Sequence, residues 1–302
     1  MLASVYYYLI AFLAPLFYAT SLVIESFLSL AVFKRPLVMV FFVSLTNALF
    51  TPLVLLLGVP TIPTLSSIII YLLIATIDIC YLYPYYTALK KTDTSIVSSL
   101  FALGKIFVPF AAFILLNETL SVEQYIGFFI IIATSSILSK KTRARLRLNK
   151  AFYFMFLSSF LLAIRICLAK LVMEWDHNFI NVLVYPNLIS GLIPFTFLLS
   201  VRNKYAIKRK FPIYKKQFKF FVIIEFLTAI AIATSTIALS KLSPVICTAI
   251  EATEPLFVLV IALLINSTGC FHFHEKTSVF KKITCFLLII LGIILTCFSK
   301  QT

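Results

Sequence analysis

The stretch Ala88-Leu89-Lys90-Lys91 recurs about 150 residues later as Ala238-Leu239-Ser240-Lys241. Further along, Glu118-x-x-Ser121-Val122 returns as Glu275-x-x-Ser278-Val279, after a seven-residue insertion. Between these stretches five positions carry the same residue in both copies without a gap: Ile96, Ala102, Phe107, Val108 and Ala112, against Ile246, Ala252, Phe257, Val258 and Ala262. Almost everything that repeats is apolar. A doubled membrane unit favours a transporter that alternates between two facings over an anchor or a membrane enzyme.

The composition of the chain is that of a membrane protein. Of its 302 residues, 62% are hydrophobic and only 12% are charged, which is more apolar surface than a water-soluble domain needs. A hydrocarbon core of about 30 Å requires about 20 apolar residues per helix. The first residues lack a positively charged region, and apolar character continues to about Val32. We therefore expect a first transmembrane helix there rather than a cleaved signal peptide.

The hydropathy pattern predicts an all-α membrane protein with ten transmembrane helices. The apolar runs are too long for strands and do not alternate with period two, which disfavours a barrel. Because each half contains five helices, an odd number, the second half enters the membrane inverted relative to the first. We predict a first five-helix repeat at 1–139, a basic connecting loop at 140–150 and a second repeat at 151–302. The expected helices span 4–31, 36–57, 66–88, 94–116, 122–139, 151–174, 179–200, 219–240, 243–265 and 280–298.

The basic residues fall almost entirely on one side of this topology. The odd-numbered connections carry 21 of the 26 lysine and arginine residues, most densely at 140–147 and 202–219. The positive-inside rule then places these connections in the cytoplasm and both termini outside, in what we expect to be the plasma (inner) membrane. The net charge of +15 therefore indicates topology and contact with lipid headgroups, not nucleic acid.

The repeat resembles the EamA-type half of the drug/metabolite transporter superfamily. The residues that carry this resemblance are Tyr86-Thr87-Ala88-Leu89, Leu116-Asn117-Glu118-Thr119-Leu120 and Gly127 in the first half, and Ile237-Ala238-Leu239, Glu254-Pro255-Leu256-Phe257 and Gly292 in the second. The resemblance implies a ten-helix carrier of small polar metabolites or drugs. Its cavity would lie between helices 1–4 and 6–9, with helices 5 and 10 peripheral. The chain departs from the family at Lys105, which stands in place of a mid-helix proline, and at the insertion 266–274.

Ionisable side chains inside the expected helices are the main candidates for function, because each costs a few kcal/mol in a bilayer unless it faces a cavity or a partner. Those placed near mid-membrane are Asp78, Lys105, Arg165, Glu251 and Glu254. Glu251 and Glu254 are three residues apart, so we expect them on one helical face, where one of the two could hold a proton or bind a cationic group. The alternative is a structural salt bridge from these carboxylates to Lys105 or Arg165.

Lys105 and Arg165 suit a substrate carboxylate or phosphate, but pairing with Glu251, Glu254 or Asp78 explains them equally well. With both signs of charge at mid-depth, the simplest cargo is amphoteric. Three further ionisable residues lie nearer the ends of expected helices, and we expect them to snorkel or to cap helices: Glu25, Lys170 and Glu225. Glu225 is also a weaker candidate for the cavity.

Four tyrosines end the expected third helix: Tyr81, Tyr83, Tyr85 and Tyr86. An interfacial belt is the favoured interpretation, and a stacking wall that includes Tyr81 and Tyr85 is the alternative. Candidate hinges are the prolines within expected helices 1, 4 and 9: Pro15, Pro109 and Pro255. Glu118 and Glu275 are expected to cap the helices that follow them.

The sequence predicts no catalytic residues, no cofactor and no metal. His272-x-His274 lacks further ligands at suitable spacing, and no nucleotide-binding loop is present. We expect a secondary active transporter that moves a small polar or amphoteric metabolite, such as an amino acid or an S-adenosylmethionine-like compound, by alternating access, with protons as a candidate coupling ion. The alternatives are an exporter of cationic drugs or toxic metabolites and, in another class, a non-transporting membrane protein or membrane enzyme. The sequence leaves a homodimer open.

Overall fold

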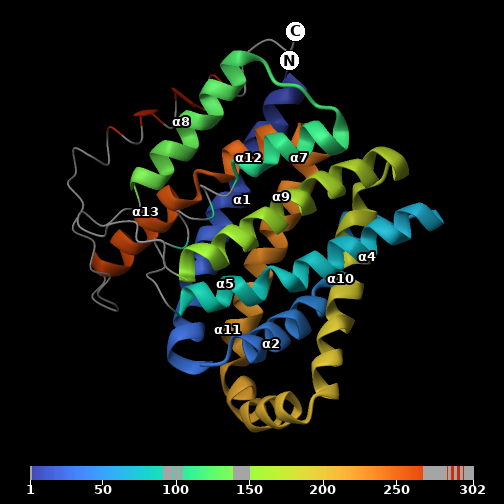
Figure 1. Cartoon of the computed structure of the whole chain (residues 1–302), viewed down its shortest axis with the longest axis vertical. Coiled ribbons are helices and arrows are strands. Elements are labelled where there is room, and N and C mark those ends of the chain that lie inside the picture. The colour runs from blue at the N-terminus through green and yellow to red at the C-terminus, as the bar shows by residue number, and fades with distance from the viewer. Residues whose placement is uncertain are drawn as a thin grey trace.

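The structure of the chain is a computed structural model, and it is a bundle of helices (Figure 1). It describes residues 2–90, 97, 101, 105–138, 150–267 and a few positions near the C-terminus, namely 284, 287, 288, 291, 292 and 295. Within this part of the chain every regular element is a helix. The predicted all-α class is therefore confirmed, whereas the loop expected at 140–149 lies outside the described residues.

Within the described residues, six segments are long and apolar enough to cross a membrane. Their bounds are Val5–Ser26, Pro36–Leu57, Leu65–Leu89, Tyr153–Asp176, Phe179–Leu199 and Val201–Leu239. They are built from α1 (Leu2–Phe27) with η1 (Leu28–Val32), α2 (Pro36–Ala48) with α3 (Thr51–Val54) and η2 (Leu55–Leu57), α4 (Leu65–Cys80) with α5 (Leu82–Leu89), α9 (Lys150–Asp176), α10 (Phe179–Leu192) with η3 (Ile193–Leu199), and α11 (Val201–Leu239). Shorter apolar helices are α7 (Phe107–Leu116) and α8 (Val122–Leu138), and α12 (Pro244–Glu251) and α13 (Glu254–Ser267) follow α11. A multi-pass membrane protein is thus confirmed.

One predicted connection is wrong, because the basic run 202–219 is helical. It forms the first part of α11, a helix of 39 residues. At about 1.5 Å per residue such a helix is roughly 58 Å long, well beyond a hydrocarbon core of about 30 Å. In Figure 1 this first part lies across the bottom of the view, and the rest of α11 rises through the bundle beside α1.

The basic part of α11 is helical because one of its faces is apolar. Ile207, Tyr214 and Phe221 recur every seven residues and are each at most 5% exposed. The Tyr214 ring stacks on Phe42 with centroids 4.4 Å apart, and its hydroxyl lies 2.9 Å from the hydroxyl of Thr46 in α2. The lysines and arginines occupy the other face, so the charge run is one side of an amphipathic helix.

Two of the helices that we expected to be continuous are interrupted. In the segment 243–265, α12 ends at Glu251 and α13 starts at Glu254, with a turn at 252–253. Pro255, the second residue of α13, has no N–H to continue a ladder from α12. In the segment 94–116, a turn at 105–106 precedes α7. These interruptions lie at nearly the same position of the two sequence copies.

Glu118 does not cap the helix that follows it. The backbone N–H of Gln124 donates to the Ser121 hydroxyl at 3.3 Å, and the Ser121 N–H donates to the Gln124 side chain at 3.1 Å. This reciprocal pair is a capping box, in which Ser121 is the N-cap residue immediately before the start of α8 at Val122. The corresponding Glu275 lies outside the described residues.

Small residues let the helices approach closely. A Cβ atom placed on Gly292 would lie 2.9 Å from the carbonyl oxygen of Gly127, so the two glycines that carry the family resemblance face each other. A Cβ on Gly191 in α10 would lie 2.5 Å from the Cβ of Ala48 in α2. Close contact of this kind is how membrane helices gain packing energy. Cys167 and Cys247 are also buried as small packing residues, and both are free thiols.

We predict that Gly191→Ala lowers the stability of the folded protein by roughly 1–3 kcal/mol, because the added methyl group overlaps Ala48. Adding Ala48→Gly should restore most of the loss, since it removes the opposing methyl group. Thermal unfolding in detergent measures both changes. Leu192→Ala, at a neighbouring side chain that is 69% exposed, is the control. An unchanged midpoint for Gly191→Ala would show that α2 and α10 are not in tight contact.

Candidate substrate cavity

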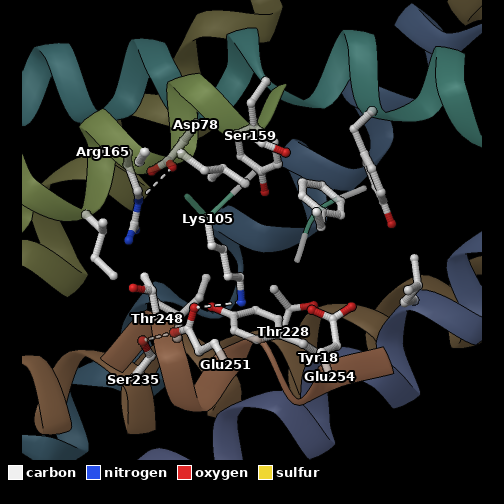
Figure 2. Close-up of a pocket in the computed structure, with 18 of the residues that line it drawn as sticks. Tyr18, Asp78, Lys105, Ser159, Arg165, Thr228, Ser235, Thr248, Glu251 and Glu254 are labelled. Atoms are coloured by element: carbon white, nitrogen blue, oxygen red, sulfur yellow. Dashed lines mark hydrogen bonds and ion pairs between the residues drawn. The ribbon is translucent and has the colours of Figure 1, made fainter. Parts of the chain in front are cut away.

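A cavity of about 190 Å³ lies in the middle of the bundle. Figure 2 shows that polar and charged side chains point into it from opposite sides. The cavity brings together seven of the residues predicted from the sequence: Asp78, Tyr81, Tyr85, Lys105, Arg165, Glu251 and Glu254. They come from α4, the α4–α5 junction, α5, the turn before α7, α9, and the facing ends of α12 and α13. Glu225, the remaining predicted ionisable residue, does not line it.

The first ion pair of the cavity joins α9 to α4. The Arg165 Nε donates to Asp78 Oδ1 at 2.9 Å, and each side chain is 18% exposed. Direct contact of the two helices along their lengths places these residues opposite each other. An arginine–carboxylate contact at this distance is a charge-assisted hydrogen bond.

The second ion pair joins the turn before α7 to the end of α12. Lys105 Nζ lies 3.5 Å from Glu251 Oε2, with the side chains 16% and 14% exposed. The other carboxylate oxygen of Glu251 accepts a 2.5 Å hydrogen bond from the Ser235 hydroxyl of α11. The lysine contact is long for a hydrogen bond, so Glu251 is held more firmly by Ser235 than by Lys105.

Both pairs connect one half of the sequence to the other. Asp78 and Lys105 precede the basic stretch at 140–150, and their partners Arg165 and Glu251 follow it. The salt-bridge alternative is therefore the arrangement that the structure contains. Lys105 reaches across the cavity to Glu251, whereas Asp78 and Arg165 lie together on one wall (Figure 2). Anything that separates either pair also loosens a contact between the two halves.

Glu251 and Glu254 do not share one continuous helical face, contrary to the prediction. The turn at 252–253 separates them, so Glu251 is the last residue of α12 and Glu254 is the first of α13. A carboxylate in the first turn of a helix is favoured by the helix dipole. Both still line the cavity, and Tyr18 of α1 lies with them in Figure 2. Tyr18 was missed because a single tyrosine in an apolar helix carries no distinguishing pattern.

The interfacial belt expected at the end of the third helix is wrong for three of its four tyrosines. Tyr85 is 5% exposed and Tyr86 is fully buried, whereas Tyr83 is 49% exposed. Tyr81 and Tyr85 line the cavity, and the Tyr85 ring lies 5.2 Å from that of Phe101. The stacking-wall alternative thus describes this region better.

The expectation that Glu25 and Glu225 snorkel or cap is also wrong. Glu25 is 9% exposed and accepts a 2.6 Å hydrogen bond from the Tyr85 hydroxyl, and Glu225 is 2% exposed. Glu25 lines the cavity, which the sequence did not predict. For Lys170 the expectation is confirmed, because its Nζ donates to the carbonyl of Leu239 at the end of α11 at 3.0 Å.

The candidate hinges lie where helices change course or begin. Pro15 is inside α1, Pro109 is the third residue of α7, and Pro255 is the second residue of α13. The helices that contain them all border the cavity through other residues.

The described residues contain no group of three or more histidine, cysteine or acidic side chains that could hold a metal ion. The His272-x-His274 motif and the insertion that carries it lie outside the described part of the chain, apart from the first two residues of the insertion.

The comparisons with known proteins agree with this architecture. Residues 5–140 match the model of the EamA-like transporter family. These residues belong to that family. A solved structure titled "Crystal structure of protein" matches with a TM-score of 0.65 and 14% sequence identity, over 95% of this chain and 94% of that chain. At this identity the likeness shows the fold alone. A search of curated proteins found no match.

The EamA-like match over residues 5–140, together with the apolar helices, indicates an integral, multi-pass membrane protein of transporter type. It implies a small-molecule substrate. It also confirms the resemblance on which the sequence analysis relied, for the first half of the chain.

We predict that the Asp78–Arg165 pair shows strong energetic coupling. Asp78→Asn and Arg165→Gln should each destabilise the protein by up to roughly 3–5 kcal/mol, because each leaves a buried charge without its partner. The double variant should lose less than the sum, with a coupling energy of about 0.5–3 kcal/mol in thermal unfolding. Asp78→Asn combined with Glu174→Gln, an exposed site on α9, is the control that should be additive. Additive losses for Asp78 and Arg165 would mean that the pair contributes nothing.

Proposed function

We propose that the protein is a secondary carrier that moves a small amphoteric molecule by alternating access. The observation that carries this proposal is that two ion pairs, Lys105–Glu251 and Asp78–Arg165, line one central cavity. Together they present two cationic and two anionic groups to the same space. A molecule with one carboxylate and one ammonium group matches this arrangement.

Exchange of partners is the physical step that would link binding to movement. A carboxylate of the cargo can take over Lys105 while its ammonium group takes over Glu251, so that no buried charge is left unpaired at any stage. The 3.5 Å contact between Lys105 and Glu251 is the longer of the two pairs and the easier one to replace. Because this pair joins the two halves of the chain, its replacement would free one half to tilt against the other.

The architecture that we propose is ten helices in two inverted five-helix repeats, 1–139 and 151–302, joined by 140–150. Support comes from two turns that lie within three residues of each other in the aligned repeats, at 105–106 and 252–253. Helices broken near mid-membrane at a repeat interface are typical of carriers. Gly127 and Gly292, one from each half, lie close together, as expected where two repeats pack against each other. Pro15, Pro109 and Pro255 are the proposed hinges.

Export of cationic compounds is the second candidate function. It is favoured by Glu25, a carboxylate that lines the cavity next to an aromatic wall of Tyr81, Tyr85 and Phe101. A carboxylate beside aromatic faces is the arrangement that binds organic cations. The two candidates differ in whether cargo needs Lys105 and Arg165.

We predict that purified protein in liposomes takes up or exchanges at least one member of a panel of amino acids, S-adenosylmethionine-like cations and cationic dyes. Glu251→Gln should reduce this transport by about tenfold or more, because a charge-assisted hydrogen bond of roughly 1.5–3 kcal/mol is lost. Glu174→Gln, which removes a carboxylate that is 55% exposed, is the matched control. Uptake is measured with radiolabelled or fluorescent compounds.

Two outcomes of this transport assay would contradict the proposal. Wild-type rates in Glu251→Gln would exclude a role for the Lys105–Glu251 pair in transport. Uptake of cations alone, insensitive to Lys105→Met and Arg165→Met, would favour the exporter of cationic compounds instead.

We predict that the protein lies in the plasma (inner) membrane, with both termini outside and the basic connections on the cytoplasmic side. The support is that Lys210 in the basic part of α11 lies 3.5 Å from the carbonyl of Val32, close in the chain to Lys34 and Arg35, whereas α1 begins at the other end of the bundle in Figure 1. A C-terminal reporter that is active only in the cytoplasm should give no signal. The same reporter inserted within 140–150 should be active, and a strong C-terminal signal would reverse the topology.

A further inference from the structure

A pair of buried carboxylates lies between α1 and α11, apart from the two ion pairs of the cavity. Glu25 is 9% exposed and Glu225 is 2% exposed, and about one turn away along both helices the Ser21 and Thr228 hydroxyls lie 2.9 Å apart between α1 and α11. Both lie toward the basic end of the bundle, since Glu225 follows the basic part of α11 by six residues and Glu25 lies in the last turn of α1. Nothing in the proposed exchange of ion pairs uses this pair.

Hydrogen-bond donors lie beside these carboxylates, but among the described residues no lysine, arginine or histidine forms an ion pair with either of them. The Tyr85 hydroxyl donates to Glu25 Oε2 at 2.6 Å. The fully buried hydroxyl of Tyr86 is a second donor close to Glu25, whereas Glu225 Oε1 has no hydrogen-bond partner in this part of the chain. The titratable groups that face the pair from the elements around it are Tyr81 at the α4–α5 junction, Tyr85 and Tyr86 of α5, Tyr214 of α11 and Glu254 of α13.

Two ionised carboxylates cannot share such a site at an acceptable free energy. Moving one ionised carboxylate out of water without a partner costs several kcal/mol, and a second one beside it adds repulsion in a low dielectric. A neutral carboxylic acid avoids both costs, and it can also donate to the facing oxygen. Glu225 Oε1 is buried without a hydrogen-bond partner, so it is the atom at which we place this proton.

We propose that Glu25 and Glu225 together hold one exchangeable proton and form the site where the carrier couples to a proton gradient. Because Glu25 lines the cavity, it connects this proton to cavity water, while Glu225 lies behind it. The proposal rests on the transport function proposed above. It moves the coupling site away from Glu251 and Glu254, because Glu251 is already held by Lys105 and Ser235.

The proposed coupling balances charge. With one proton bound, the two carboxylates carry a net charge of −1. When a cationic group of the cargo reaches Glu25, the proton leaves to cavity water, the pair becomes −2, and the bound cation restores the sum to −1. One proton is thus exchanged for one positive charge, which is the stoichiometry of an antiporter.

An infrared experiment tests the proton without any cargo. Full-length protein in lipid nanodiscs is perfused between acidic and alkaline buffer, and the carbonyl stretch of protonated carboxylic acids is followed in the difference spectrum. We expect a band that titrates in the wild type and in Glu174→Gln, and that is lost in Glu225→Gln and in Glu25→Gln. A band that titrates unchanged in both of these variants would overturn the proposal.

A transport experiment tests the coupling with ethidium as the probe. In proteoliposomes, Glu225→Gln should keep ethidium exchange without a gradient but should lose its stimulation by a pH gradient. Stimulation that persists in Glu225→Gln, or that a sodium gradient supplies equally well, would show that the pair is not the proton site. If wild-type protein does not exchange ethidium at all, the cationic cargo is excluded, and the infrared band still decides whether the proton is bound.

Discussion

A charge inside a membrane protein needs a partner of opposite sign, and this requirement organises the centre of the molecule. Arg165 and Lys105 are cations inside the bundle, and each is matched by a carboxylate that lines the same cavity. Removal of either partner would leave a buried charge at a cost of several kcal/mol. The helices that carry these residues are therefore fixed relative to one another by polar contacts, in addition to apolar packing, which by itself discriminates poorly between neighbouring helices in lipid.

The sequence was informative about what crosses the membrane and less so about what meets inside it. The span 36–57 was predicted with the bounds that the structure has, because the length of an apolar run is a direct consequence of bilayer thickness. The density of lysine and arginine in the stretch before Lys219 predicts a loop between two membrane helices, and this prediction overlooks the apolar residues among them. Its apolar residues at 207, 214 and 221 recur every seven residues, and this spacing indicates a helix with one buried face.

The errors at the candidate site have a common physical origin. Distance along the chain from the end of a helix was treated as depth in the membrane. The helical conformation around Glu25 ends at Val32, one residue beyond the expected span, so Glu25 is buried by the helices that pack around it. For Glu225 the helix itself differs, because α11 begins at Val201, well before the expected start at 219. The partners of Asp78 and Lys105 were named only as alternatives, because one sequence gives the depth of a charge but not the identity of the helix that faces it.

The arrangement of charges separates two tasks that an antiporter must perform. The sequence places five acidic and three basic side chains within the expected helices. Glu251 and Asp78 form ion pairs with Lys105 and Arg165, and Lys170 donates a hydrogen bond to the carbonyl of Leu239. The negative charge in excess therefore includes Glu25 and Glu225, on the side of the cavity formed by α1 and α11. A cargo that carries a positive charge is attracted to that side, and an anion without an ammonium group is repelled by it. Recognition by balanced ion pairs at the centre and proton exchange at an acidic flank can then be altered independently, since they use different residues of the same cavity.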